Sequence, residues 1–329
     1  MNNYNRVTNI LGIKYPIVQA AMSWITDAKM VAAVSNAGGL GILGPHAGYN
    51  TAPTGGTTEV RERLRKEIRK TKSLTDKPFG VNLYMPKVGW EKYARATFEV
   101  ALEEGVKYFV SVGEVNKEMI EEIKQREGIL LLRELTPTVE GAKLAEDYGA
   151  DIIIATGYDE GGWIPQNKIG TFSIVPTIAD AVTIPVMATG GINDIRGVRA
   201  SFALGAEGVY VGTRFIVSGE CPAADSAKQD IINSKGSDLL LVSNMQRSTP
   251  HRFARELGEN FKSAEDSTIN EQKISEIGGL LPGMLLGDLD KGINSVNTAI
   301  DLIKEVKSCK EIIHELMADF INKEQESDH

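Results

Sequence analysis

Cysteine and histidine, the side chains most often used in metal sites and redox centres, are scarce in this sequence. Among 329 residues there are two cysteines, Cys221 and Cys309, and four histidines. Two cysteines so far apart in the chain predict neither a disulfide framework nor a metal site. Unpaired cysteines are typical of a reducing compartment, and the sequence therefore favours the cytoplasm.

Long apolar runs and an excess of positive charge are also lacking. No run approaches the roughly 18 apolar residues of a transmembrane helix, and the first residues have no apolar core of the signal-peptide type. The formal net charge is −8 and the isoelectric point is about 5.3. This charge argues against nucleic acid or an anionic membrane as the main partner. We expect a small-molecule substrate as the partner, with a homodimer left open.

Glycine is abundant, with 33 residues, and two patterns alternate along the chain. Short apolar runs fit strands buried on both faces, and amphipathic stretches of helical period lie between them. This alternation predicts an α/β fold with parallel strands, and eight repeats predict closure into a TIM (β/α)8 barrel. The predicted strands are 16–21, 39–44, 79–85, 108–113, 129–136, 151–157, 184–190 and 208–213. The predicted helices are 27–36, 60–72, 91–104, 117–125, 139–148, 172–181 and 194–204.

Two regions depart from this alternation. Residues 45–58 form a long connection rich in Gly, Pro and Thr after the second strand, where we expect a lid or substrate loop. After Thr213 the pattern becomes mostly helical, and we expect this C-terminal extension to pack over the active-site face. The predicted division is a cofactor-binding barrel at 1–218 and a helical substrate-side subdomain at 219–290. Residues 291–329 would form a C-terminal helix and charged tail that close on the barrel.

Glycines end three of the last predicted strands. Gly190 and Gly191 follow the seventh strand, and Gly212 and Thr213 follow the eighth, where (β/α)8 barrels often bind phosphate. Backbone amides and the Thr213 hydroxyl can donate to phosphate oxygens there. A further pair, Gly161-Gly162, follows the sixth strand. The alternative is that these glycines serve only the turns.

A different glycine motif, Gly39-Leu40-Gly41-Ile42-Leu43-Gly44, matches the dinucleotide pattern G-x-G-x-x-G. That pattern binds a pyrophosphate only where it follows a strand and opens a helix. Here a helix precedes it and a proline follows it. We therefore interpret the motif as a glycine-rich barrel strand.

Asn82 and His46 are the polar residues with the best-placed candidate roles. Asn82 lies inside the third strand, where its buried amide needs a partner, either a bound ligand or neighbouring backbone. His46 lies in the long loop on the catalytic side and is a candidate acid or base. His251 has weaker support. We expect His314 and His329 to lie in the solvated tail. We also expect Arg133, Glu134 and Lys168 to be surface charges with no role in the site.

In order along the chain, several segments together resemble the nitronate monooxygenase (2-nitropropane dioxygenase) family, which also holds flavin-dependent enoyl-acyl-carrier-protein reductases. The resemblance extends over the predicted barrel and into the C-terminal helices. Its segments are YPIVQAAM at 15–22, VSNAGGLG at 34–41, KPFGVN at 77–82, GG at 161–162, ATGGI at 188–192 and VGTRF at 211–215.

The resemblance implies FMN as the cofactor. Three residues of the first segment, Ala21, Met22 and Ser23, would line the isoalloxazine, and Asn82 would bond its edge. By the same resemblance, Gly161, Gly162, Gly190, Gly191, Gly212 and Thr213 would hold the ribityl phosphate.

One position departs from the family. Its members usually carry a proton-handling histidine directly after the glycine pair of the sixth strand, and this sequence has Trp163 there. Indole neither accepts nor delivers a proton at neutral pH. Trp163 is therefore expected to shape the catalytic pocket, while proton transfer would fall to His46, Tyr158, Asp159, Tyr84 or water.

Three functions are compatible with these features. The first is an FMN-dependent oxidoreductase that oxidises alkyl nitronates with dioxygen, since a nitronate is already a carbanion equivalent and needs no strong base. The second is an NAD(P)H-dependent reductase of enoyl thioesters or quinones, with acyl carrier protein as a partner. A basic stretch at 61–72 could serve that partner, but a solvated outer helix face is the simpler interpretation. The third is a flavin-binding subunit with little activity of its own.

Overall fold

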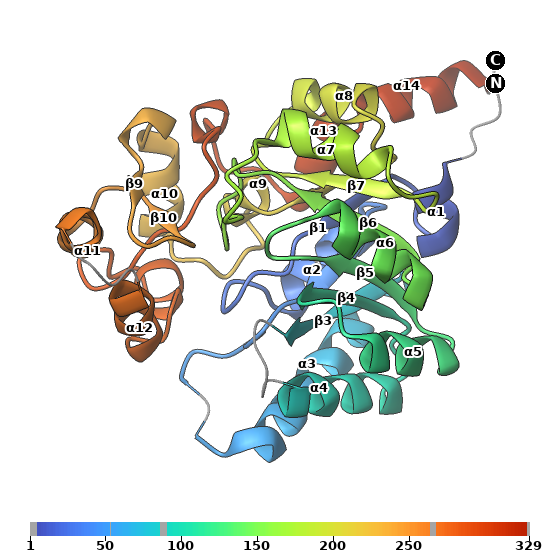
Figure 1. Ribbon diagram of the computed structural model, residues 1–329, viewed down its shortest axis with the longest axis horizontal. Helices are drawn as coiled ribbons and strands as arrows, with labels where there is room; N and C mark the ends of the chain where they lie inside the picture. Colours follow the sequence, from blue (N-terminus) through green and yellow to red (C-terminus); the bar gives the residue numbers. More distant parts are fainter. Residues whose placement is uncertain (1–4, 53, 86–90, 264–267, 328–329) are drawn as a thin grey trace.

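The computed structural model describes residues 5–52, 54–85, 91–263 and 268–327, and its centre is a parallel eight-stranded sheet (Figure 1). Neighbouring strands follow the order β1-β8-β7-β6-β5-β4-β3-β2. A parallel bridge between Val18 and Leu40 joins β1 to the segment entering β2 and brings the two ends of the sheet together. The predicted TIM-barrel fold is therefore confirmed.

Each predicted strand is present, usually somewhat shorter than the sequence pattern. The strands are β1 Ile17–Gln19, β2 Gly41–Leu43, β3 Phe79–Met85, β4 Tyr108–Gly113, β5 Ile129–Arg133, β6 Ile152–Thr156, β7 Val186–Thr189 and β8 Gly208–Val211. The helices of the barrel are α1 Arg6–Leu11, α2 Ala28–Asn36, α3 Gly56–Leu74, α4 Glu91–Glu103, α5 Lys117–Gln125, α6 Val139–Tyr148, α7 Thr171–Ala179 and α8 Ile195–Ala203.

Side-chain capping determines where several of these helices begin. Asp27, Asn116 and Thr138 accept hydrogen bonds from the backbone amides of Met30, Met119 and Gly141, which satisfies donors that a first helical turn leaves free. The helix predicted from residue 60 begins earlier, at Gly56. The long connection after β2 is correspondingly shorter than predicted.

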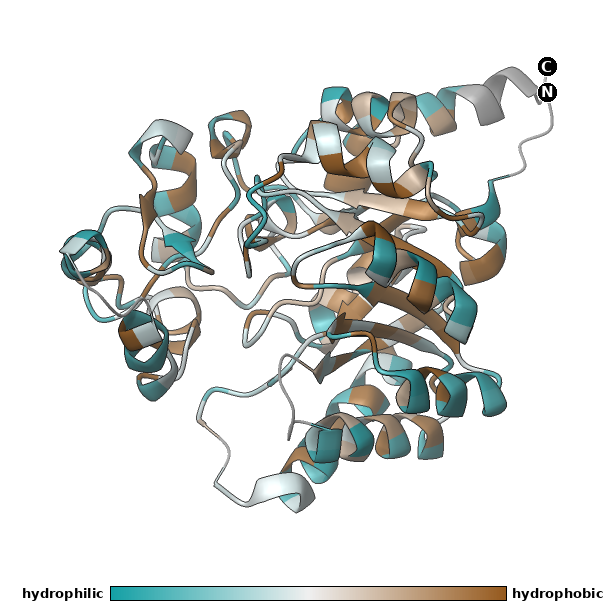
Figure 2. Ribbon diagram, in the orientation of Figure 1, coloured by the Kyte–Doolittle hydropathy of each residue, from teal (hydrophilic) through white to brown (hydrophobic). Residues whose placement is uncertain are grey.

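The sheet has an apolar cluster on each of its two faces, because successive residues along a strand point to opposite faces. Val110 and Val112 of β4, with Ile152 and Ile154 of β6, belong to a cluster that fills the barrel. The residues between them on β6 belong to the larger cluster under the surrounding helices. Val7 and Leu11 of α1 join the inner cluster and so close one end of the barrel. Figure 2 shows mostly apolar strands surrounded by helices that combine apolar and polar residues.

The motif at 39–44 forms a barrel strand, as predicted. Gly41 lies in β2, and a Cβ added there would lie 2.8 Å from the Cα of Val31 in α2. The glycine therefore permits close packing of helix on strand. The next helix begins only at Gly56, so the motif has no helix N-terminus beside it at which to hold a pyrophosphate.

The C-terminal extension lies between β8 and the last helix that packs on the barrel. It contains α9 Thr213–Ile216, α10 Asp225–Asn233, β9 Leu240–Leu241, β10 Arg247–Ser248, α11 Arg252–Ser263 and α12 Thr268–Glu276, with short helices at Gly236–Asp238, Leu281–Leu285 and Ile300–Leu302. The elements from β9 to α12 lie to one side of the barrel in Figure 1. Val242, Leu257 and Ile274 contribute to a separate small apolar cluster there. The chain then returns as α13 Cys309–Leu316, which contacts α2 and α8, and ends in α14 Ala318–Ser327.

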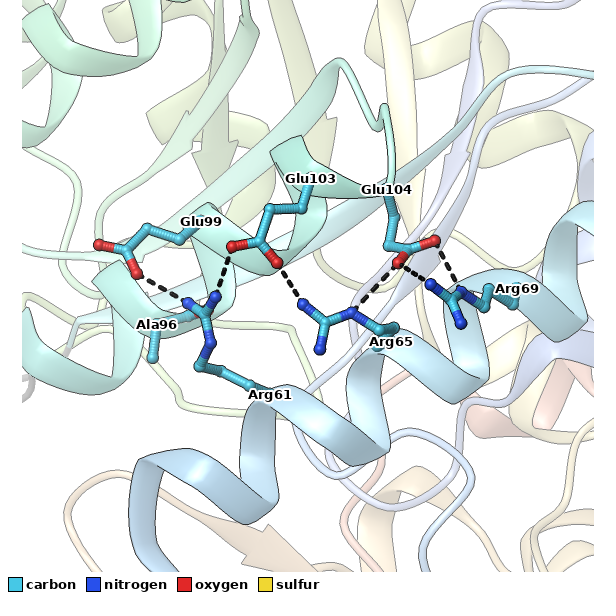
Figure 3. A network of polar contacts seen from close by, with 7 residues as sticks. All are labelled: Arg61, Arg65, Arg69, Ala96, Glu99, Glu103 and Glu104. Atoms are coloured by element: carbon cyan, nitrogen blue, oxygen red, sulfur yellow. Dashed lines mark hydrogen bonds and ion pairs between the residues drawn. The ribbon is translucent and has the colours of Figure 1, made fainter.

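The basic stretch at 61–72 is paired with a neighbouring helix. On α3, three arginines spaced four residues apart face three glutamates in the last turns of α4 and directly after it (Figure 3). The pairs are Arg61 with Glu99 and Glu103, Arg65 with Glu103 and Glu104, and Arg69 with Glu104. The predicted outer helix face is thus an interhelical ion-pair network.

No helix in the described ranges is both long enough and apolar enough to cross a membrane.

Gly41→Ala should destabilise the protein by roughly 1–3 kcal/mol, because the added methyl group meets the backbone of α2. Gly219→Ala is the matched control, since no atom lies within 4 Å of its added Cβ. Urea unfolding of both variants measures the difference. Equal stabilities would contradict the close packing described for β2 and α2.

Candidate active site

The carboxyl ends of the eight strands form the face that the extension covers. Several hydrogen bonds join the extension to the loop after β6. Among them, the Thr298 amide donates to the Asp159 carbonyl at 3.0 Å, the Ile164 amide donates to the Met245 carbonyl at 2.9 Å, and the Ser295 hydroxyl donates to the Gly161 carbonyl. The extension therefore packs over the active-site face, as the sequence predicted.

The loop after β1, which carries Ala21, Met22 and Ser23, is fixed from two neighbouring strands. The phenol of Tyr210 on β8 accepts a hydrogen bond from the Ala21 amide at 2.8 Å. Gly44, just after β2, has no space for a side chain, since an added Cβ would lie 2.6 Å from the Met22 carbonyl oxygen. The Met22 sulfur lies 3.7 Å from the Cβ position of Gly212. Two of the predicted cofactor-binding segments thus lie side by side.

Free backbone donors gather at the ends of β7 and β8. Within the described part of the chain, the amides of Gly190, Gly191, Gly212 and Thr213 have no hydrogen-bond acceptor. Gly190 and Gly191 have φ values of 115° and 72°, a region that favours glycine. Since β7 and β8 are neighbours, their ends bring these donors to adjacent loops. Such a set of amides suits an anionic group such as phosphate.

A buried amide network supports this part of the site. Asn193 and Asn297 each donate a side-chain hydrogen bond to the other, at 2.9 and 2.8 Å. The Asn297 backbone amide donates to the Thr213 hydroxyl oxygen at 3.0 Å, which leaves the Thr213 hydroxyl proton for another acceptor. The extension therefore orients one of the residues predicted to hold the phosphate.

The two glycines after β6 have different surroundings. An added Cβ on Gly161 would lie 2.5 Å from the Asn297 amide nitrogen, so this glycine permits close approach of the extension. No atom lies within 4 Å of an added Cβ on Gly162, which is exposed. Only Gly162 therefore borders open space.

Asn82 is buried within the barrel, and its side-chain nitrogen donates to the Val110 carbonyl at 2.9 Å. The sequence analysis left open whether this amide bonds a ligand or neighbouring backbone, and its nitrogen bonds neighbouring backbone. This bond fixes the orientation of the side chain in the middle of β3.

Arg133 is not a surface charge, and this corrects the sequence analysis. It has the same parity on β5 as Leu131, which lies inside the barrel, and it is 6% exposed. Its guanidinium pairs with Glu160, which is 8% exposed and follows β6. The same guanidinium also donates to the Trp163 carbonyl at 3.3 Å. Lys168 is exposed, as predicted, and Glu134 is half-buried, with its carboxylate accepting from the Thr138 amide at 3.1 Å.

Burial raises the pKa of Glu160 to about 7, although Arg133 and Arg247 both act to lower it. Arg247 comes from β10 and is itself buried, donating to the Tyr158 carbonyl at 2.5 Å. Its guanidinium lies 4.9 Å from the centre of the Tyr158 ring. Two arginines from different parts of the chain thus hold the loop that carries Tyr158, Glu160 and Trp163.

Trp163 lies edge-on to Tyr84 of β3, with ring centres 6.0 Å apart and an angle of 69° between the planes. The loop after β6 therefore reaches towards β3. Burial raises the pKa of Tyr84, so its phenol stays protonated at neutral pH. Asp159 is engaged with backbone, because its carboxylate accepts from the Thr171 amide at 2.7 Å.

His46 is stacked on Trp24, with ring centres 4.1 Å apart and planes 8° from parallel. Both residues have positive φ, 62° and 71°. Burial, with a smaller contribution from Arg63, lowers the pKa of His46 to about 4. A histidine with this pKa is neutral at pH 7 and is a poor proton donor there.

The other two histidines that the structure describes, His251 and His314, lie in other parts of the fold. His251 lies 2.7 Å from an Asp230 carboxylate oxygen in the extension, and His314 is exposed, as predicted. His329 lies outside the described residues. In the described ranges, no group of three His, Cys, Asp or Glu side chains could hold a metal ion.

The chain can be assigned to a family because a family profile matches almost its whole length. The sequence profile of nitronate monooxygenase matches residues 4–319. The chain belongs to the nitronate monooxygenase family. Membership in this family makes the protein an oxidoreductase.

Relatives within and around the nitronate monooxygenase family match most of the chain. A probable nitronate monooxygenase of Staphylococcus haemolyticus is 36% identical over 79% of this chain and 81% of its own. FabK from Thermotoga maritima is 32% identical, covers 99% of both chains and superposes with a TM-score of 0.84. A nitroalkane oxidase from Streptomyces ansochromogenes has a TM-score of 0.77 over 97% of this chain, and at 24% identity it supports the fold alone.

Sequence reasoning missed the buried polar groups at the upper end of the barrel and on the adjoining extension. Arg133, Glu160, Tyr210 and Arg247 were given no role in the site, and neither was Thr156, a buried hydroxyl with no partner among the described residues. The available signal was parity: Arg133 follows Leu131 by two residues within an apolar strand, which places both on one face.

Glu160→Gln should change how stability depends on pH. Because the folded-state pKa of Glu160 lies above its ordinary value of 4.5, folding favours the protonated form, and this stabilisation is lost as pH rises through about 7. From pH 5 to 8 the wild type should therefore lose roughly 2–3 kcal/mol of unfolding free energy relative to Glu160→Gln. Urea unfolding at several pH values measures this difference, and parallel pH profiles would contradict it.

Proposed function

We propose that the protein is an FMN-dependent nitronate monooxygenase, oxidising alkyl nitronates with dioxygen. The main support for FMN as the cofactor is a set of free backbone amides that suits its phosphate. These are the amides of Gly190, Gly191, Gly212 and Thr213. Family membership supports the substrate class. When bound, FMN would accept electrons from the nitronate and pass them to dioxygen.

Each predicted cofactor-binding segment has a role in this proposal. Ala21, Met22 and Ser23 would line the isoalloxazine, with their loop held by Tyr210. Asn82 would approach the ring edge from β3, and Gly162, beside open space, would face the ribityl phosphate. Gly161 would act indirectly, since it lets the extension reach the loop after β6. Trp163 would shape the substrate side of the pocket, next to Tyr84.

The second candidate is an NAD(P)H-dependent reductase of enoyl thioesters or quinones. The observation that favours it is the similarity to FabK from Thermotoga maritima over 99% of both chains. An acyl carrier protein is acidic and would need a basic surface. The arginines of α3 are already paired with the glutamates of α4, so this face supplies few free charges for such docking. A flavin-binding subunit remains the third candidate.

Anaerobic stopped-flow absorbance of the flavin-loaded protein distinguishes these candidates. The monooxygenase proposal predicts loss of the visible flavin absorbance on mixing with alkyl nitronate, and little change with NADH or NADPH. Rapid loss with either nicotinamide would favour the reductase instead. No response to any donor would leave only the flavin-binding subunit.

A further inference from the structure

A cavity lies at the amino ends of the first three strands, on the face of the barrel opposite the candidate active site. Tyr15 precedes β1, Gly39 precedes β2 and Pro78 precedes β3, and all three line the cavity. The helix α13 supplies a further wall. The volume is about 430 Å³, which is enough for a molecule of nucleotide size.

Basic side chains from three segments of the chain line this cavity. Lys14, Lys77 and Lys310 each come from a different segment, and His314 lies one turn after Lys310 on α13. Among the described residues no Asp or Glu lines the cavity, although acidic residues outnumber Lys and Arg in the chain by 44 to 36. Grouping like charges costs free energy because they repel one another. The lining therefore suits an anion.

Helix capping does not account for these lysines. Three of the last four carbonyls of α2, those of residues 33–35, already accept hydrogen bonds from the amides of residues 37–39. Lys310 lies in the first turn of α13, where the helix dipole disfavours a cation. In the described ranges no carboxylate pairs with Lys310, and Lys77 lies 3.6 Å from the exposed carboxylate of Asp76. The charge of Lys310 thus lacks a structural partner.

Close contacts hold the walls of the cavity together. The Gly38 carbonyl accepts from the amides of Lys14 at 3.0 Å and Tyr15 at 2.9 Å. An added Cβ on Gly38 would lie 3.0 Å from the Tyr15 ring, and one on Gly39 would lie 3.4 Å from the side chain of Ile313 in α13. The segment before β1, the end of α2 and α13 are therefore packed tightly. A preformed pocket of this kind loses little conformational entropy when a ligand binds.

Apolar surface accompanies the basic groups. Ile13 and Pro78 line the same cavity, and the Lys14 ammonium lies 5.0 Å from the centre of the buried Tyr15 ring. A bare phosphate ion would fill only a small part of the volume. The combination suits an organic phosphate, because ammonium groups pair strongly with phosphate oxygens and apolar walls contact a carbon skeleton.

We propose that this cavity binds a small organic phosphate, of the size of a nucleoside monophosphate, at a site separate from the flavin. Lys77 and Lys310 would hold the phosphate, and the His314 ring would donate a hydrogen bond to it. Ile13 and Pro78 would contact the organic part. This inference is independent of the proposed function, because the residues proposed to hold FMN lie at the other ends of the strands.

Isothermal titration tests the site with AMP, inorganic phosphate and adenosine as probes. The protein is first loaded with FMN and freed of unbound FMN, and the titration is made at low ionic strength. AMP should bind at one site per chain and at least about tenfold more tightly than inorganic phosphate, adenosine should not bind measurably, and added salt should weaken the binding of AMP. No binding of AMP would overturn the proposal. Equal affinities for AMP and adenosine would contradict the role of the phosphate, and equal affinities for AMP and phosphate that of the organic part.

Variants of the lining lysines locate the bound AMP. Lys77→Ala and Lys310→Ala should each weaken its binding about 3–10-fold, and Lys310→Glu should weaken it further. Lys304→Ala is the matched control, because it removes an exposed lysine that does not line the cavity, and it should leave the affinity within about twofold. Binding that Lys310→Glu leaves unchanged, or that Lys304→Ala weakens equally, would overturn the assignment. Failure to retain FMN would contradict the proposed function, while the comparison of these variants would still decide the site.

Discussion

Closure of the parallel sheet is the constraint on which the site depends. When β1 pairs with β8 and Val18 bridges to Leu40, all eight strand carboxyl ends face one way around a single ring. Closure brings the loops after β1, β6, β7 and β8 together, and these loops carry the predicted cofactor-binding residues. The inner apolar cluster fills the barrel below them and leaves its upper end to polar side chains.

The extension holds several residues at the strand ends of the barrel in place. It orients Thr213 through Asn297, supports the loop after β6 through Arg247 and Ser295, and leaves Gly161 no space for a side chain. The extension and the loops at the strand ends are therefore physically joined. A change in the extension can alter the site without touching the barrel.

The sequence predicted the fold well, because each barrel strand is a short apolar run bounded by polar or glycine residues. It also predicted which segments lie at the strand ends, since a barrel fixes where those ends lie. It did not predict the ion pair inside the barrel. Arg133 was taken for a surface residue because buried charges are rare, and its pairing with Glu160 depends on the distance between two strands, which no sequence pattern contains. The ion-pair network between α3 and α4 was missed for the same reason, although its arginines were noticed as a basic helix face.

We propose that the loops after β7 and β8 bind the phosphate of FMN. Isothermal titration of the flavin-free protein with FMN and with riboflavin, which lacks the phosphate, tests this most directly. We expect FMN to bind at least about 100-fold more tightly than riboflavin, a difference of roughly 3 kcal/mol. We further expect Gly212→Ala, whose methyl group the fold can accept at 3.5 Å from Ala20, to narrow this difference. Equal affinities for the two flavins would contradict this proposal.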